Sequence, residues 1–63
     1  MISLYDLLNI LNLHCELEIF DFGGYLLQEG CRGDTMWEES LLDRRVYTVL
    51  PGIVTKIYLD EEN

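Results

Sequence analysis

The side chains best suited to chemistry in this chain are one histidine and two cysteines. His14 and Cys15 are adjacent, and a hairpin after them would bring Cys31 or Gly30 opposite Cys15, with Glu16 or Glu29 completing a metal-ligand set. The spacing matches none of the paired Cys/His patterns of zinc sites, and alternation along a strand sends His14 and Cys15 to opposite faces. We therefore expect no metal and no cofactor, with Cys15 as a small buried residue. A redox pair of the two thiols is the alternative, although cytosolic thiols normally stay reduced.

Neither a catalytic centre nor a phosphate-binding loop is evident in the sequence. Nucleophilic catalysis needs a nucleophile, a base and an orienting group within hydrogen-bond reach, and the chain has no G-x-S-x-G motif to start from. Its glycines form neither the G-x-G-x-x-G motif nor the Walker spacing. A functional pair of carboxylates needs a cleft, whereas acids on a solvated strand are charges in water. We therefore predict that the protein is not an enzyme and has no small-molecule substrate.

The tripeptide Arg32-Gly33-Asp34 is known from adhesion proteins. We interpret it as a turn, because Gly and Asp are common turn residues and no export signal is visible. The first six residues have no basic region and include an acid. The longest apolar stretch, residues 7–13, contains two asparagines and is shorter than the roughly 18 residues of a membrane span. Two cysteines are too few for a disulfide framework, so we expect a cytoplasmic protein that does not contact membranes.

Acidity is the strongest feature of the composition. Four Lys and Arg against twelve Asp and Glu give a net charge of -8, which phosphate backbones repel, so direct binding of nucleic acid is not expected. A negative electrostatic field attracts positively charged grooves, and a DNA-mimicking inhibitor would use this effect. The alternative is that the acidic surface only keeps a small protein soluble. The acids expected to gather near the first hairpin and the loop after it are Glu16, Glu18, Glu29, Glu38 and Glu39.

The 63 residues are expected to form a single small domain, residues 1–63, and 49% of them are hydrophobic. A domain of this size buries only about 60% of the surface that its unfolded chain exposes, so its core cannot enclose all these side chains. We expect another chain to cover part of the excess, and a homodimer is the default expectation. Large aromatic rings favour interfaces. The candidate anchors are Trp37, Tyr47, Tyr58, Phe22 and Tyr5.

Two helices are predicted from caps and apolar spacing. Ser3 begins a capping box and leucines follow at helical spacing, which predicts a helix over residues 4–12 with Asn12 as its C-cap. Thr35 begins a second capping-box pattern, which predicts a short helix or single turn over residues 36–42. The residues of this second helix expected to face inward are Met36, Leu41 and Trp37.

Period-two alternation predicts strands over residues 14–19 and 53–59. Residues 25–29 are expected to be the returning strand of the first hairpin, and β-forming residues predict a strand over 46–50. Glycines at 23 and 24 form the first turn, and Gly30 ends the second strand. Pro51-Gly52 is the turn of the second hairpin, and residues 60–63 are expected to be a frayed acidic tail. The order α-β-β-α-β-β then predicts an α+β fold, with one four-stranded antiparallel sheet and the N-terminal helix packed on its apolar face.

Three segments together resemble a known group of proteins: Ser3 to Leu8, Glu16 to Asp21 and Leu41 to Val46. They are similar to segments of small acidic proteins encoded by phages, prophages and mobile elements of Gram-positive bacteria. The similarity spans most of the chain but includes no catalytic signature. It implies an accessory role, including that of an anti-CRISPR-like inhibitor, and it transfers no functional residue.

These observations predict a non-enzymatic protein-protein interaction module. Its partner would be another protein or a second copy of the chain, with aromatic side chains as anchors because a few buried Trp, Tyr and Arg residues carry most interface energy. The alternative is an acidic DNA mimic that inhibits a nucleic-acid-binding host protein. Salt distinguishes the two, because a mimic's affinity falls steeply with ionic strength.

Overall fold

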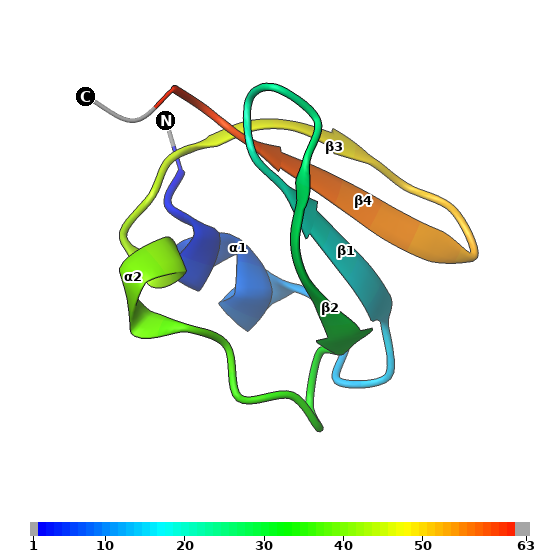
Figure 1. The fold of residues 1–63 in the computed structure, drawn as a ribbon. Coiled ribbons are helices and arrows are strands. Elements are labelled where there is room, and N and C mark those ends of the chain that lie inside the picture. Colours follow the sequence, from blue (N-terminus) through cyan, green and yellow to red (C-terminus); the bar gives the residue numbers. More distant parts are fainter. Residues whose placement is uncertain (1, 62–63) are drawn as a thin grey trace.

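A computed structural model describes residues 2–61, which form two short helices and a four-stranded sheet (Figure 1). The α+β class predicted from the sequence is confirmed. Both helices lie on one side of the sheet, and the other side is uncovered by any helix of the described residues (Figure 1). The elements are α1 (Leu4–Ile10), β1 (Glu16–Phe20), β2 (Leu26–Cys31), α2 (Glu39–Leu42), β3 (Val46–Leu50) and β4 (Val54–Leu59).

The sheet is mixed, so the prediction of a purely antiparallel sheet is wrong. The strands lie in the order β2-β1-β4-β3, and the two hairpins are antiparallel as their short turns require. The two central strands, β1 and β4, are parallel, with Leu17 beside Thr55 and Ile19 beside Ile57. Alternation predicts which side of a strand is buried but not the direction of its neighbour. Parallel pairing places the apolar sides of both hairpins in one continuous layer under α1.

Helix α1 begins at the predicted cap and ends early. The Asp6 amide donates to Ser3 Oγ over 3.1 Å, which satisfies one free donor of the first turn. The C-cap is Leu11 in an extended conformation, so the prediction of a helix to residue 12 with Asn12 as its cap is wrong. The Asn12 side chain instead accepts a hydrogen bond from the His14 amide over 2.8 Å, which turns the chain towards β1.

Helix α2 is a single turn, shorter than the predicted 36–42. Gln28 of β2 explains the difference: its Nε2 donates to the Met36 carbonyl over 2.8 Å, and its Oε1 accepts from the Glu38 amide over 3.0 Å. The backbone before α2 is therefore bonded to the sheet, and the N-cap is Glu38 without a side-chain bond. The capping box at Thr35 does not form, and Met36, expected inside, is 93% exposed.

Strand β2 continues past Gly30, which was expected to end it. A Cβ at Gly30 would overlap Thr35 Oγ1, and the φ of +154° is one that side chains rarely adopt. Glycine thus lets the strand pass directly beneath the loop that leads to α2. The register also differs from the expected pairing of Cys15 with Cys31 or Gly30, because Cys31 lies opposite Glu16 and Gly30 opposite Leu17.

The core lies between α1 and the inner side of the sheet. Its buried side chains are Leu4, Leu8, Leu17, Ile19, Leu41, Val46, Ile57 and Leu59. The predicted excess of apolar residues is visible at Ile53, which precedes β4 and is 99% exposed. Asp60, assigned to a frayed tail, is held by a bond from its amide to the Arg45 carbonyl over 2.8 Å; the tail's residues 62–63 lie outside the described residues. Within residues 2–61, no helix is long and apolar enough to cross a bilayer.

Candidate functional site

The outward side of the sheet is the largest uncovered feature of the structure, and we call it the open face. Burial alternates along the central strands, so that residues of β1 and β4 next to the core are buried and their neighbours are not. The strand pairing places these outward residues in rows across the sheet. Two rows of the open face run from β2 to β3, and they are Glu29-Glu18-Lys56-Leu50 and Leu26-Phe20-Tyr58-Thr48. A third row runs from β2 to β4 and is Cys31-Glu16-Val54.

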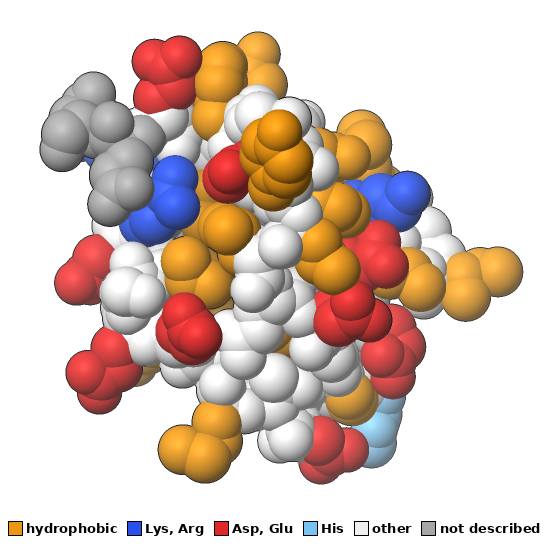
Figure 2. Space-filling model, viewed as in Figure 1, with side chains coloured by type: hydrophobic (Ala, Val, Ile, Leu, Met, Phe, Trp, Pro, Cys, Tyr) orange, Lys and Arg blue, Asp and Glu red, His pale blue; other side chains and the backbone are white. Residues whose placement is uncertain are grey.

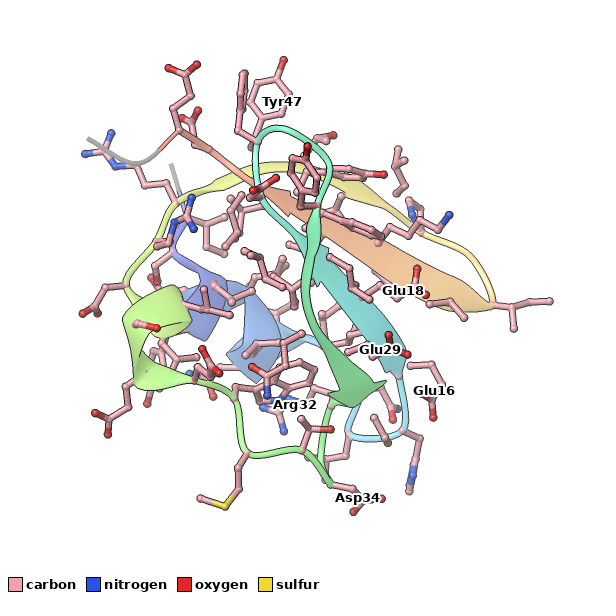
Figure 3. All side chains as sticks on the ribbon, in the orientation of Figure 1. Glu16, Glu18, Glu29, Arg32, Asp34 and Tyr47 are labelled. Atoms are coloured by element: carbon pink, nitrogen blue, oxygen red, sulfur yellow. The ribbon has the colours of Figure 1, made fainter. Side chains whose placement is uncertain are left out.

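Three of the predicted acids meet on the open face. Glu18 lies directly opposite Glu29 across β1 and β2, and Glu16 is two residues from Glu18 on the same side of β1. Figure 3 shows the three carboxylates near one another along this hairpin, and in Figure 2 acidic side chains gather on the right, beside hydrophobic ones. Lys56 lies on the other side of Glu18, across β4. Directly opposed like charges destabilise a strand pair and opposite charges stabilise one, so the pairing of Glu18 with Glu29 opposes folding whereas its pairing with Lys56 favours folding.

The other two predicted acids lie elsewhere. Glu38 is the N-cap of α2 and Glu39 is its first residue, on the side of the sheet that carries the helices. An acid in the first turn of a helix is favoured by the positive end of the helix dipole. The five acids therefore form two groups, and only Glu16, Glu18 and Glu29 belong to the open face.

Aromatic rings occupy the end of the open face farthest from Glu16. Phe20 and Tyr58, neighbours across β1 and β4, stack with ring centroids 4.8 Å apart and planes 15° apart. Beyond them, Phe22 of the first turn meets Tyr47 of β3 edge to face, with centroids 5.2 Å apart. Tyr47 is 60% exposed, and Figure 3 shows it beside this turn. Three predicted anchors, Phe22, Tyr47 and Tyr58, are thus brought to one end of the sheet.

Phe20 is not among the anchors predicted from the sequence, whereas Trp37 is. Phe20 has the same parity along β1 as Glu16 and Glu18, so strand alternation was the signal that could have placed it on the outward side. Trp37 is half-buried against the core, and its Nε1 donates to the Arg32 carbonyl over 3.0 Å. Trp37 therefore lies on the helix side of the sheet, as does Tyr5, which is exposed on α1.

Arg32-Gly33-Asp34 forms a turn, as predicted. The Asp34 amide donates to the Cys31 carbonyl over 3.2 Å, and the Gly33 amide donates to the Leu13 carbonyl over 2.8 Å. Arg32 Nε donates to the Leu8 carbonyl over 2.6 Å, in the last turn of α1. Figure 3 shows Arg32 beside α1 and Asp34 at the tip of the loop. The arginine therefore supplies the positive charge that the C-terminus of this helix lacks in its own sequence.

The two thiols are free and lie on different sides of the hairpin. Cys15 packs against the core, whereas Cys31 shares the outward row with Glu16 and its Sγ lies 3.2 Å from the Leu13 carbonyl. His14 is exposed in the loop before β1. Among the described residues, no three His, Cys, Asp or Glu side chains are grouped closely enough to hold a metal ion.

Two hollows lie outside the open face. One, of about 260 Å³, lies between α1, α2 and the loop between β2 and α2, and includes Tyr5, Leu13 and Trp37. The other, of about 430 Å³, is a shallow depression beside the first turn that includes Asp21 and Arg44. As formed by residues 2–61, neither is lined by His14, Cys15 or Cys31. The first is closed in part by Arg32 and Trp37, which already bond to the backbone.

No protein-family model matches the chain, and neither a curated protein nor a solved structure shows significant similarity to it.

Proposed function

We propose that this protein is a small, non-enzymatic interaction module that binds another protein through the open face. The observation that carries this proposal is the continuity of the face: apolar and aromatic side chains extend across all four strands with no helix of residues 2–61 over them. A cytoplasmic accessory role in a phage or other mobile element is the setting we propose, as the resemblance of the sequence implies.

The exposed apolar side chains support this proposal. Leu50 is 50% exposed and Leu26 is 47% exposed, at opposite edges of the open face. Apolar patches that are contiguous and bordered by charges mark contact surfaces more often than scattered apolar residues do. Aromatic rings such as Phe20 and Tyr58 add large contact areas at low conformational cost. The open face therefore combines apolar and aromatic side chains, at its edges and at one end, with charged side chains along its middle row, and protein interfaces contain both kinds.

A capture experiment with two matched double variants tests the proposal. Leu50→Ser/Val54→Ser removes apolar area from the open face, and Ile10→Ser/Met36→Ser removes exposed apolar area from the helix side. We expect the tagged wild-type chain and the helix-side variant to retain one protein from a lysate of the native host. The open-face variant should lose it, because the two substitutions remove apolar contact area from the binding surface.

Circular dichroism and thermal unfolding of both variants control for folding. Retention of the same protein by the open-face variant, or its loss with the helix-side variant, would contradict the assignment of the binding surface. Capture of no protein by the wild-type chain would contradict the proposed function as a whole.

The DNA-mimic alternative is kept because of the opposed carboxylates of Glu18 and Glu29. Such a mimic would bind a basic groove mainly through its field, so its capture would fall steeply between about 0.1 M and 0.5 M salt. It would also be insensitive to Leu50→Ser/Val54→Ser. Loss of capture with Leu50→Ser/Val54→Ser therefore distinguishes an apolar contact of the open face from the mimic.

A further inference from the structure

We infer that the open face takes an arginine-bearing segment of a partner protein and not a second copy of this chain. Guanidinium groups of that segment pair with Glu18 and Glu29 and lie against the rings of Phe20 and Tyr58. This inference rests on the proposed function and specifies the chemistry of its partner.

The apolar and aromatic part of the face defines where the segment lies. Leu26, Phe20, Tyr58 and Thr48 form one row across the four strands, and neighbouring strands are about 4.8 Å apart. The row is therefore about 15 Å long, which an extended or helical segment of a partner can cover. No helix within residues 2–61 covers this row.

The charge next to this row selects a cationic occupant. Glu18 precedes Phe20 by two residues on the same side of β1, a separation of about 7 Å, and Glu29 lies directly opposite Glu18. Across a strand pair the two Cβ atoms are about 5 Å apart, and such like-charged pairs destabilise the sheet. Lys56 lies beside Glu18 on β4 and offsets one of the carboxylates of Glu16, Glu18 and Glu29, so the site keeps an excess of negative charge. A cation placed between Glu18 and Glu29 would reduce the repulsion that remains.

Arginine fits the combination of rings and carboxylates better than lysine. A guanidinium is planar, stacks on aromatic faces and donates in a fork that matches a carboxylate, whereas an ammonium is a compact and strongly hydrated charge. Phe20 and Tyr58 lie in the row adjacent to Glu18, so one bound arginine can contact a ring and its neighbour can contact a carboxylate. The proximity of both chemistries predicts a preference for arginine.

A second copy fits the same face poorly. A symmetric dimer brings the same patch of each copy together, so the carboxylates of Glu16, Glu18 and Glu29 would approach their equivalents in a chain of net charge -8. Lys56 is the single ammonium in the rows of the open face as residues 2–61 form them. Like charges in an interface oppose association, which favours a basic partner over self-association.

Synthetic peptides of about twelve residues that alternate arginine with serine, lysine with serine, or glutamate with serine are suitable probes. Binding to the full chain is measured by calorimetry at about 0.05 M and 0.3 M salt. We expect the arginine peptide to bind about threefold more tightly than the lysine peptide and the glutamate peptide not to bind. Amide chemical shifts should change in β1 and β4.

Two double variants of equal charge localise the effect. Glu18→Gln/Glu29→Gln should weaken binding of the arginine peptide by about fivefold or more. Glu38→Gln/Glu39→Gln removes the same charge at α2 and should change it by less than about twofold. Phe20→Leu/Tyr58→Leu should remove the preference for arginine over lysine while the protein still folds, as checked by circular dichroism.

Equal effects of the two carboxylate variants, or equal affinity for arginine and lysine peptides, would overturn the inference. So would sedimentation of the free chain as a dimer at low salt that Leu50→Ser/Val54→Ser converts to a monomer. If the capture experiment succeeds while the peptides show no preference, the proposed function stands and only the arginine assignment fails. If capture fails but the arginine preference is found, the proposed binding of a host protein fails, whereas the assignment of arginine to the open face stands.

Discussion

Gly30 lies where β2 passes closest to the loop that covers its inner side. A Cβ added there would overlap Thr35 Oγ1 and would lie 3.2 Å from Thr35 Cβ, so the loop or the strand must move. We expect Gly30→Ala to lower the free energy of unfolding by about 2–4 kcal/mol, because both overpacking and an unfavourable φ contribute. Urea denaturation measures the change.

Gly24 provides the matched control, because it also has a positive φ, +89°, but nothing lies within 4 Å of the position that a Cβ would occupy there. Gly24→Ala should therefore lower the free energy of unfolding by only about 1 kcal/mol. In a Thr35→Ala background the loss caused by Gly30→Ala should shrink. If Gly30→Ala and Gly24→Ala lower the free energy of unfolding equally, and Thr35→Ala does not change this, the close contact with Thr35 is not the reason for glycine at position 30.

The contrast between Trp37 and Phe20 shows what a residue type alone predicts. A lone tryptophan in a small chain suggests an interface anchor, yet Trp37 donates to the Arg32 carbonyl and packs against the core. Phe20 is of the same residue type as the predicted anchor Phe22 but was not among the anchors, and its position in β1 places it outward. Residue type alone does not show which rings are gathered together, whereas the strand pairing does.

At the scale of elements, Arg32 connects the end of β2 to the end of α1. Arg32→Met keeps much of the apolar stem but removes the bond from Nε to the Leu8 carbonyl and the charge near the helix C-terminus. We expect the free energy of unfolding to fall by about 1–2 kcal/mol. Thermal or urea unfolding measures the loss.

Arg45→Met is its control, because Arg45 is exposed and the substitution changes the net charge by the same amount. It should change the free energy of unfolding by less than about 0.5 kcal/mol. Equal losses for the two variants would mean that the charge of the chain, and not the helix contact, determines the effect.

The pairing of β1 with β2 contains the repulsion between Glu18 and Glu29. Glu29→Gln should raise the free energy of unfolding by about 0.5 kcal/mol at low salt, because one member of the opposed pair becomes neutral. The gain should become smaller near 0.5 M salt, where the repulsion is screened. The control is Glu39→Gln, a substitution in α2 that removes the same charge and is measured in parallel urea titrations. An equal gain in the free energy of unfolding would show that the pair of Glu18 and Glu29 is not the source of the effect.

For the whole molecule, the sequence predicted the local elements better than their assembly. The Ser3 cap, both hairpins and the buried side of β1 follow from spacing over a few residues, and the structure confirms them. The parallel contact of β1 with β4 joins segments far apart in the chain, and alternation carries no information on direction. The bonds from Gln28 to the backbone before α2 are equally non-local, which is why the predicted second helix was too long.

The candidate site was predicted in part for the same reason. Acidic and aromatic residues were recognised by type, but the sequence did not show that Glu38 and Glu39 would lie away from Glu16, Glu18 and Glu29. Nor did it show that Phe22 and Tyr47, from different hairpins, would meet. These groupings depend on the strand order, which places the two hairpins side by side.

The central claim is that the uncovered side of the sheet is the binding surface of this protein. The most direct test is paramagnetic relaxation of the chain's amides by a soluble gadolinium chelate, measured for the free chain and for its complex with the captured protein. We predict that protection on binding is concentrated in β1, β3 and β4, at Glu18, Leu50 and Lys56. Protection concentrated instead at Ile10 and Met36 on the helix side, with the sheet still accessible, would contradict the claim.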